Sequence, residues 1–208
     1  PLRLVGSEMC IRDRIDAAHV VGAAQTRNLG TIGGNLVTCV PSMDSGPTLM
    51  ALDAQVTILG PNGKRQSSLE DFFVAPRKTS LNRDELLLEI IIPRKSLGKA
   101  AGFIKFGLRK GQALALVNAA SSLCLEGDKC YDVRIALGAV APVVIRAKKA
   151  ESILEGQKLS DELIDEAAKI AVGEAKPIDD FRASKKYRNN LIEVAVRRTL
   201  KSAMLILK

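Results

Sequence analysis

The chain has 208 residues, of which 47% are hydrophobic, so it can bury the core of one large domain or of two small ones. Its formal net charge is +8. However, the basic residues are spread along the chain and only 3% of residues are aromatic, a pattern that argues against nucleic-acid binding. No apolar run approaches the roughly 20 residues that span a bilayer, and no signal-peptide pattern is present. We therefore expect a cytoplasmic protein without a membrane span.

The first unit of the chain is predicted to be α+β. Residues 1–14 show no helix or strand periodicity, and VGSEMCIRD resembles a translated sequencing adaptor, so this segment is treated as foreign. The remaining elements of the first unit, which covers residues 15–97, are a helix at 15–24, a glycine-rich loop, a helical turn at 45–54, two strands around a Pro-Asn-Gly turn at 55–69 and a strand at 85–93.

The second unit, residues 98–208, is predicted to have three antiparallel strands followed by helices. The strands are expected at 102–110, 113–126 and 130–140, and the helices at 146–156, 160–175 and 184–208. Ser160 and Ser184 are placed as helix N-caps. The segment PIDDFRASKKYR leads into the last helix. It could hold an acid-base site of Asp179, Asp180 and Arg182, but a capped structural loop in which Arg182 pairs with the acids is favoured.

The cysteine and histidine pattern predicts neither a metal site nor a catalytic histidine. Cys10, Cys39, Cys124 and Cys130 include no pair with the two-residue spacing of zinc or redox motifs. Cys124 and Cys130 are expected to be reduced, on facing strands. His19 is expected to be a packed or surface residue rather than a general base.

Residues 30–35, GTIGGN, are called the glycine segment. Neither a Walker loop nor a Rossmann fingerprint fits its G-x-x-G-G spacing. Its consecutive backbone N–H groups carry little side-chain bulk, which is typical of an anion-binding nest that could hold a pyrophosphate. Asn35 would fix the loop or the ligand, and Asp44 could accept hydrogen bonds from ribose or ribityl hydroxyls. A glycine turn capped by Asn35 and Asp44, with no ligand, remains the alternative.

Five ordered motifs resemble the FAD subunits of molybdopterin dehydrogenases, the family of the xanthine dehydrogenase and carbon monoxide dehydrogenase flavoproteins. They extend over residues 15–208 and read QTRNLGTIGGN with TCVPSMD, ELLLEIIIP, FIKFGLRKGQALALVNAA, ALGAVAPVVIRAKKAE, and PIDDFRASKKYRNNLIEVAVRRTL. The resemblance implies the C-terminal lobe of a two-lobed, vanillyl-alcohol-oxidase-like FAD-binding domain, followed by a small domain of a three-stranded antiparallel sheet with helices.

The resemblance also implies a set of cofactor-binding residues. The residues that match the loop around the FAD pyrophosphate are Thr31, Ile32, Gly33, Gly34 and Asn35. Asp44 matches an acid that contacts the cofactor, Leu87 an aliphatic residue against the isoalloxazine, and Lys105 a lysine near the ring. A cation at that position would stabilise the negative charge of a reduced flavin. Without a flavin, Leu87 would be a core leucine and Lys105 a solvated strand lysine.

The function implied is an oxidoreductase subunit that passes electrons from iron-sulfur clusters through FAD to NAD or another acceptor. The clusters and the molybdopterin would belong to partner subunits, and the motifs look nearer the xanthine dehydrogenase branch. The family's first Ala-Gly-Gly-Thr-Asp segment has no match before Ile15, which predicts an N-terminally truncated chain. A truncated assembly module that no longer binds flavin, and a carbon-monoxide-dehydrogenase-type subunit, are the alternatives.

Overall fold

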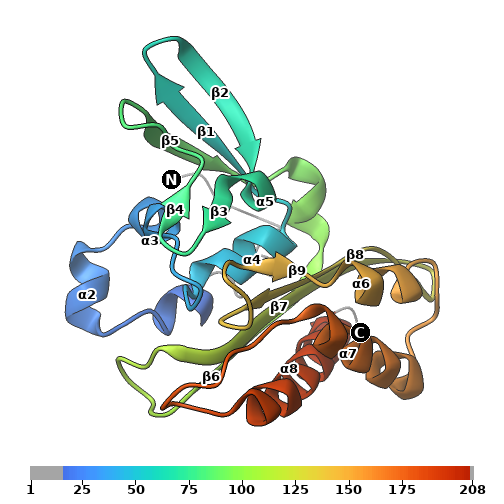
Figure 1. The fold of residues 1–208 in the computed structure, drawn as a ribbon. Helices are drawn as coiled ribbons and strands as arrows, with labels where there is room; N and C mark the ends of the chain where they lie inside the picture. The colour runs from blue at the N-terminus through green and yellow to red at the C-terminus, as the bar shows by residue number, and fades with distance from the viewer. Residues whose placement is uncertain (1–15, 207–208) are drawn as a thin grey trace.

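The computed structural model describes residues 16–206 and shows two α+β units around antiparallel sheets (Figure 1). Residues 1–14, predicted to be foreign to the fold, lie outside the described residues. The elements follow the predicted order, because most of them are encoded by local apolar periodicity. The main differences lie in the glycine-rich region and at the edge of the second sheet, and the structure adds a short two-stranded sheet at residues 73–79 and a 3-10 helix at residues 94–98.

The N-terminal unit contains a three-stranded antiparallel sheet with strand order β2-β1-β5. Its strands are β1 Gln55–Gly60, β2 Gly63–Ser68 and β5 Leu86–Ile91. The remaining elements of this unit are α2 Ala24–Leu29, α3 Ile32–Thr38, α4 Ser45–Ala51, α5 Leu69–Phe72, β3 Phe73–Ala75 and β4 Lys78–Thr79. Pro61 and Asn62 form the predicted turn between β1 and β2, where Gly60 pairs with Gly63.

Two predictions about the glycine-rich region are wrong. Residues 15–24 do not form one helix: residues 16–19 are helical, and Gly22, with φ of +53°, separates them from α2. The glycine segment is not an open loop either, because α3 begins at Ile32 and includes both Gly33 and Gly34. The reason is local, since the Thr31 side chain caps α3 and offsets the poor helix propensity of glycine.

The C-terminal unit contains a four-stranded antiparallel sheet with strand order β6-β7-β8-β9 rather than the three strands predicted. Its elements are β6 Ala100–Gly107, β7 Ala115–Glu126, β8 Lys129–Gly138, β9 Ile145–Arg146, α6 Lys148–Leu154, α7 Asp161–Glu174 and α8 Lys185–Ile206, preceded by the 3-10 helix η1 Arg94–Gly98. The extra strand, β9, is only two residues long, which is too short for a periodicity signal.

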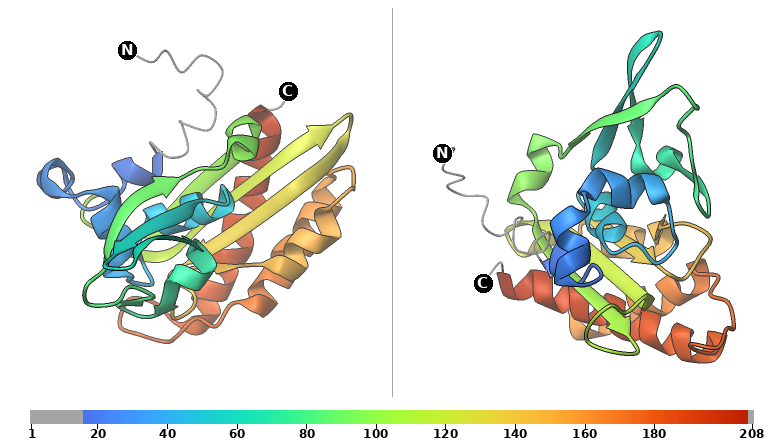
Figure 2. Two further views of the ribbon diagram at one scale, coloured as in Figure 1. Left: turned by 90° about the horizontal axis from the view of Figure 1, so that it is seen from above. Right: turned by 90° about the vertical axis from the view of Figure 1, so that its left-hand side faces the viewer.

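The central strand β7 is buried on both faces. Helix α4 lies on one side of its sheet and α8 on the other (Figures 1 and 2). Val117, Ala119 and Leu123 pack in a core with α6, α7 and α8. Ala120, on the opposite face, joins the core of the N-terminal unit, which includes the fully buried helix α4. This double burial explains why β7 reads as a nearly continuous apolar run.

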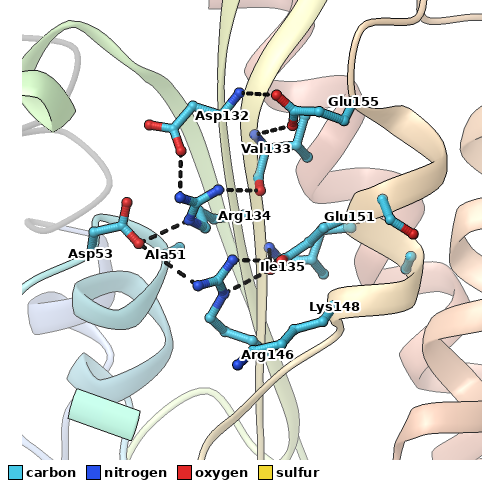
Figure 3. A network of polar contacts seen from close by, with 12 residues as sticks. Ala51, Asp53, Asp132, Val133, Arg134, Ile135, Arg146, Lys148, Glu151 and Glu155 are labelled. Atoms are coloured by element: carbon cyan, nitrogen blue, oxygen red, sulfur yellow. Dashed lines mark hydrogen bonds and ion pairs between the residues drawn. The ribbon is translucent and has the colours of Figure 1, made fainter. Parts of the chain in front are cut away.

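A charged network joins the two units (Figure 3). Asp53, just after α4, pairs through Oδ1 with Arg134 Nε of β8 at 2.8 Å. Arg134 also pairs with Asp132 at 2.5 Å, and Arg146 of β9 pairs with Glu151 of α6 at 2.6 Å. Burial alone would raise the pKa of Asp53, but the hydrogen bond and charge of Arg134, with smaller contributions from nearby lysines, lower it overall.

The segment before α8 is structural, as favoured from the sequence. Arg182 pairs with Asp180 at 2.6 Å, and the Lys185 N–H donates to Asp179 Oδ1. The sequence did not reveal Arg188, which is 1% exposed. Its guanidinium pairs with Asp180 and donates to two backbone carbonyl oxygens, so an apparently solvent-facing arginine in fact anchors the helix.

Cys124 and Cys130 are free cysteines on the facing strands β7 and β8, as expected. Cys130 stands opposite Leu125, whereas Cys124 stands opposite Tyr131. Consecutive residues of a strand point to opposite faces, so the two thiols lie on different faces of the sheet. His19 is exposed.

Candidate functional site

The start of α3 forms one wall of the candidate site. Thr31 is in extended backbone geometry, and its hydroxyl accepts a hydrogen bond from the Gly34 N–H at 2.9 Å. The Asn35 N–H donates to the Thr31 carbonyl oxygen at 3.0 Å. The N–H groups of Ile32 and Gly33 make no hydrogen bond within the described part of the chain. Of the five predicted nest donors, the helix therefore uses the N–H groups of Gly34 and Asn35, and the other three, including that of Thr31, have no partner among the described residues.

A cavity of about 560 Å³ opens beside this helix start. Its lining includes the predicted residues Thr31, Ile32, Gly34 and Asn35. A second cavity of about 330 Å³ is lined by Asn35 and Asp44. Asn35 thus borders both cavities, and its Oδ1 accepts a hydrogen bond from the Ser45 hydroxyl at 2.6 Å. That contact fixes the amide between the two spaces.

Leu87 of β5 reaches the glycine segment from the sheet. A Cβ atom added at Gly33 would lie 3.4 Å from Leu87 Cδ2. The half-buried leucine packs against the core of the N-terminal unit. Gly33 therefore faces Leu87, so two predicted positions that are far apart in sequence lie close together in the structure.

Asp44 and Lys105 form a buried ion pair. Lys105 Nζ lies 2.6 Å from Asp44 Oδ2, and both side chains are 8% exposed. Lys105 also donates to the Val20 carbonyl oxygen at 2.9 Å. Lys105 is therefore not a solvated strand lysine. Burial raises the pKa of Asp44, and the hydrogen bond and charge of Lys105, with a hydrogen bond from Asn118, oppose that rise without cancelling it.

Two residues at this site were missed by sequence reasoning. Ser45 orients Asn35, and Asn118 of β7 donates to Asp44 Oδ1 at 3.0 Å. Asn118 is fully buried in a strand that is otherwise rich in small and apolar residues. A polar amide in the middle of such a strand could have indicated a buried hydrogen-bonding role for Asn118 from the sequence, because a buried amide needs a partner.

Comparisons with known proteins assign each of the two units to a family. Residues 4–95 match the family described as the FAD binding domain in molybdopterin dehydrogenase, and residues 103–203 match the CO dehydrogenase flavoprotein C-terminal domain. A structure of reconstituted CO dehydrogenase from Oligotropha carboxidovorans superposes with a TM-score of 0.87 at 30% identity, covering 96% of this chain and 68% of that chain.

Curated relatives come from several enzymes. The chain is 31% identical to the glyceraldehyde dehydrogenase medium chain of Sulfolobus acidocaldarius, over 89% of its own length and 65% of the relative. It is 27% identical to a xanthine dehydrogenase FAD-binding subunit of Escherichia coli O157:H7, over 90% of its length and 65% of the relative. The chain thus spans about 65% of the length of these relatives.

The two matched domains and the shared fold place the chain among the FAD-binding chains of molybdopterin dehydrogenases. This chain belongs to the molybdopterin dehydrogenase flavoprotein family. The family that matches the N-terminal unit is described as binding FAD.

The residues present fit an FAD. The 560 Å³ cavity lies within the size range of cofactor sites. Gly33 lines neither cavity, whereas Gly34 lines the larger one. The side-chain-free backbone there, with the N–H groups of the first turn of α3 that have no partner among the described residues, suits a phosphate group, and a buried carboxylate suits hydroxyl groups. Among the described residues, no cluster of metal-ligating side chains is found and no helix is long and apolar enough to cross a bilayer.

Proposed function

We propose that this chain binds FAD at the glycine segment and the Asp44–Lys105 pair, and serves as the electron-transfer subunit of a molybdenum hydroxylase. Electrons would arrive from the iron-sulfur subunit, which receives them from the molybdopterin-binding subunit, and leave to NAD or another acceptor. When bound, FAD supplies the redox chemistry. The cytoplasmic location expected from the sequence is part of this proposal.

The observation that carries the proposal is the convergence of separate segments on one cavity region. Asn35 borders both cavities, Leu87 contacts the glycine segment, and Lys105 reaches Asp44 from the other unit. Backbone N–H groups would hold the pyrophosphate, and the Asp44 carboxylate would accept from hydroxyl groups. Lys105 would place a cation near the reactive ring, and the apolar cavity wall would exclude water.

The proposal does not assign the chain to a dehydrogenase of one particular substrate. The chain is similar to glyceraldehyde, carbon monoxide and xanthine dehydrogenase subunits at 31%, 30% and 27% identity. The nearness to the xanthine dehydrogenase branch remains a prediction. Substrate choice would rest with the molybdopterin-binding partner.

The test measures how strongly the protein binds FAD after a glycine in helix α3 is replaced by valine. Gly33→Val introduces bulk where only Leu87 Cδ2 lies within 4 Å, so the fold should tolerate it while close approach to the backbone is lost. Gly173→Val is the matched control, because Gly173 lies in α7 with nothing within 4 Å of its Cβ position.

We expect Gly33→Val to weaken FAD binding at least about tenfold, the equivalent of about 1.4 kcal/mol, and Gly173→Val to leave it unchanged. The measurement is a flavin fluorescence titration of the full-length gene product. Equal affinity in wild type and Gly33→Val would remove the glycine segment from the cofactor site.

A further inference from the structure

Asn118 connects the C-terminal sheet to the candidate site. It pairs across the sheet with Lys105 of β6, and its side chain is 0% exposed. Its Nδ2 donates to the Met43 carbonyl oxygen at 2.9 Å and to Asp44 Oδ1 at 3.0 Å. One amide therefore holds both the backbone that leads into α4 and the carboxylate that precedes this helix.

The Asp44 carboxylate is held from two sides. Oδ1 accepts from Asn118, whereas Oδ2 pairs with Lys105 at 2.6 Å. Because each oxygen has its own partner, the plane of the carboxylate is fixed. Lys105 is fixed in turn, since its ammonium group also donates to Val20. The position of the cation thus depends on a residue that lines neither cavity.

Gly138 of β8 makes room for this amide. It stands opposite Asn118 in the sheet, and a Cβ atom there would lie only 2.2 Å from Asn118 Oδ1. Within the described residues Oδ1 has no hydrogen-bond partner. Asn118 therefore acts at this site through its N–H₂ group, which a carboxylate of the same shape lacks.

We propose that Asn118 is a positioning residue for the flavin site: its amide fixes Asp44, Asp44 fixes Lys105, and the C-terminal sheet thereby sets the charge presented to the flavin. The last step rests on the proposed function. The first two steps concern this chain alone and are testable without FAD.

The first experiment measures how fast Lys105 is acetylated by acetic anhydride, with mass spectrometry as the readout. Asn118→Ala removes a hydrogen bond to a charged group, so we expect Lys105 to be labelled about tenfold faster, through easier local opening. Ser121→Ala is the matched control, because it removes a buried hydrogen bond to Thr199 from the same strand. Equal labelling in wild type and Asn118→Ala, or equal increases in both variants, would overturn the positioning role.

A second variant separates hydrogen bonding from space filling. Asn118→Leu keeps nearly the same side-chain shape and has neither a donor nor a charge, so Lys105 labelling should rise as in Asn118→Ala. Wild-type labelling in Asn118→Leu would show that only volume matters. If neither variant folds, the NMR signals of the Asn118 side-chain amide in the wild type provide the test. Although the amide is buried, its resonances should shift when FAD is added. Unchanged resonances in the FAD-bound protein would refute the proposal.

The last arm uses the full-length gene product and FAD. We expect Asn118→Ala to weaken FAD binding about tenfold and to lower the flavin reduction potential, and Ser121→Ala to change neither. Failure of the wild type to bind FAD would refute the proposed function, while the acetylation result would still decide whether Asn118 positions Lys105. If Asn118→Ala binds FAD with wild-type affinity and shows the wild-type flavin reduction potential, only the proposed role of Asn118 toward the flavin is refuted.

Discussion

The buried pair between Asp44 and Lys105 should show strong energetic coupling in unfolding experiments. Asp44→Asn leaves the ammonium group of Lys105 without its counter-charge in a site where both side chains are 8% exposed. Removing one partner of such a pair costs about 3 kcal/mol, the lower end of measured values. At about 2–4 °C per kcal/mol for a chain of this size, the melting temperature should fall by about 10 °C.

Lys105→Met should destabilise less at low pH than at neutral pH. Without the lysine, the pKa of Asp44 rises further, because burial already raises it. An acid whose pKa is raised in the folded state carries a penalty above that pKa, and the penalty disappears as the pH falls toward the unfolded value of about 4. The variant should therefore recover stability relative to wild type between pH 7 and about pH 4.

The double variant completes the cycle. Asp44→Asn with Lys105→Met removes both charges, so its cost should be smaller than the sum of the single costs by about 2 kcal/mol. The matched control is the exposed pair of Lys158 and Asp128, at 3.1 Å, which should show much weaker coupling because water and salt screen it. Additive costs for Asp44 and Lys105, measured by urea unfolding, would refute the buried pair.

Substitutions at three further positions test other parts of the structure by urea unfolding. Thr31→Ala removes the acceptor of the Gly34 N–H and should lower the free energy of unfolding by about 1 kcal/mol, whereas Thr31→Ser keeps the hydroxyl group and should not. Equal stability of the two variants would contradict the helix cap. The pKa of Asp53 is lowered, so its ionised form contributes stability above the unfolded value of about 4, and this contribution is lost progressively as the pH falls through the folded pKa. Wild type should therefore exceed Asp53→Asn in stability most at pH 7 and by less as the pH falls below about 4; a difference independent of pH would refute this contribution. Arg188→Met should lower the free energy of unfolding by about 3 kcal/mol, because it removes the ion pair with Asp180 and two hydrogen bonds to backbone carbonyl groups. Wild-type stability in Arg188→Lys would show that the fork of the guanidinium group is not required.

Local patterns predicted most elements of the fold. The strand at β5 and the helix α7, with Ser160 accepting from the Leu163 N–H, followed from apolar periodicity and capping preferences. The glycine segment was mispredicted because its low helix propensity suggested a loop, whereas the Thr31 cap supports a helix. Propensity is a weak guide where one side-chain contact decides the outcome.

Contacts between distant segments were harder to predict. The resemblance to a known family placed Asp44 and Lys105 at one site, but no local pattern shows that residues 61 positions apart form an ion pair. Asn118 and Arg188 were missed because their roles depend on which element packs against them. Buried polar groups of this kind become interpretable only once the strand and helix neighbours are known.

The most direct test of the proposed function is the visible absorption spectrum of the full-length gene product after incubation with excess FAD and desalting. The account predicts flavin bands in wild type and in Gly173→Val, and their loss in Gly33→Val. Wild-type protein that retains no flavin, while remaining folded, would contradict the assignment of this chain as an FAD-binding subunit.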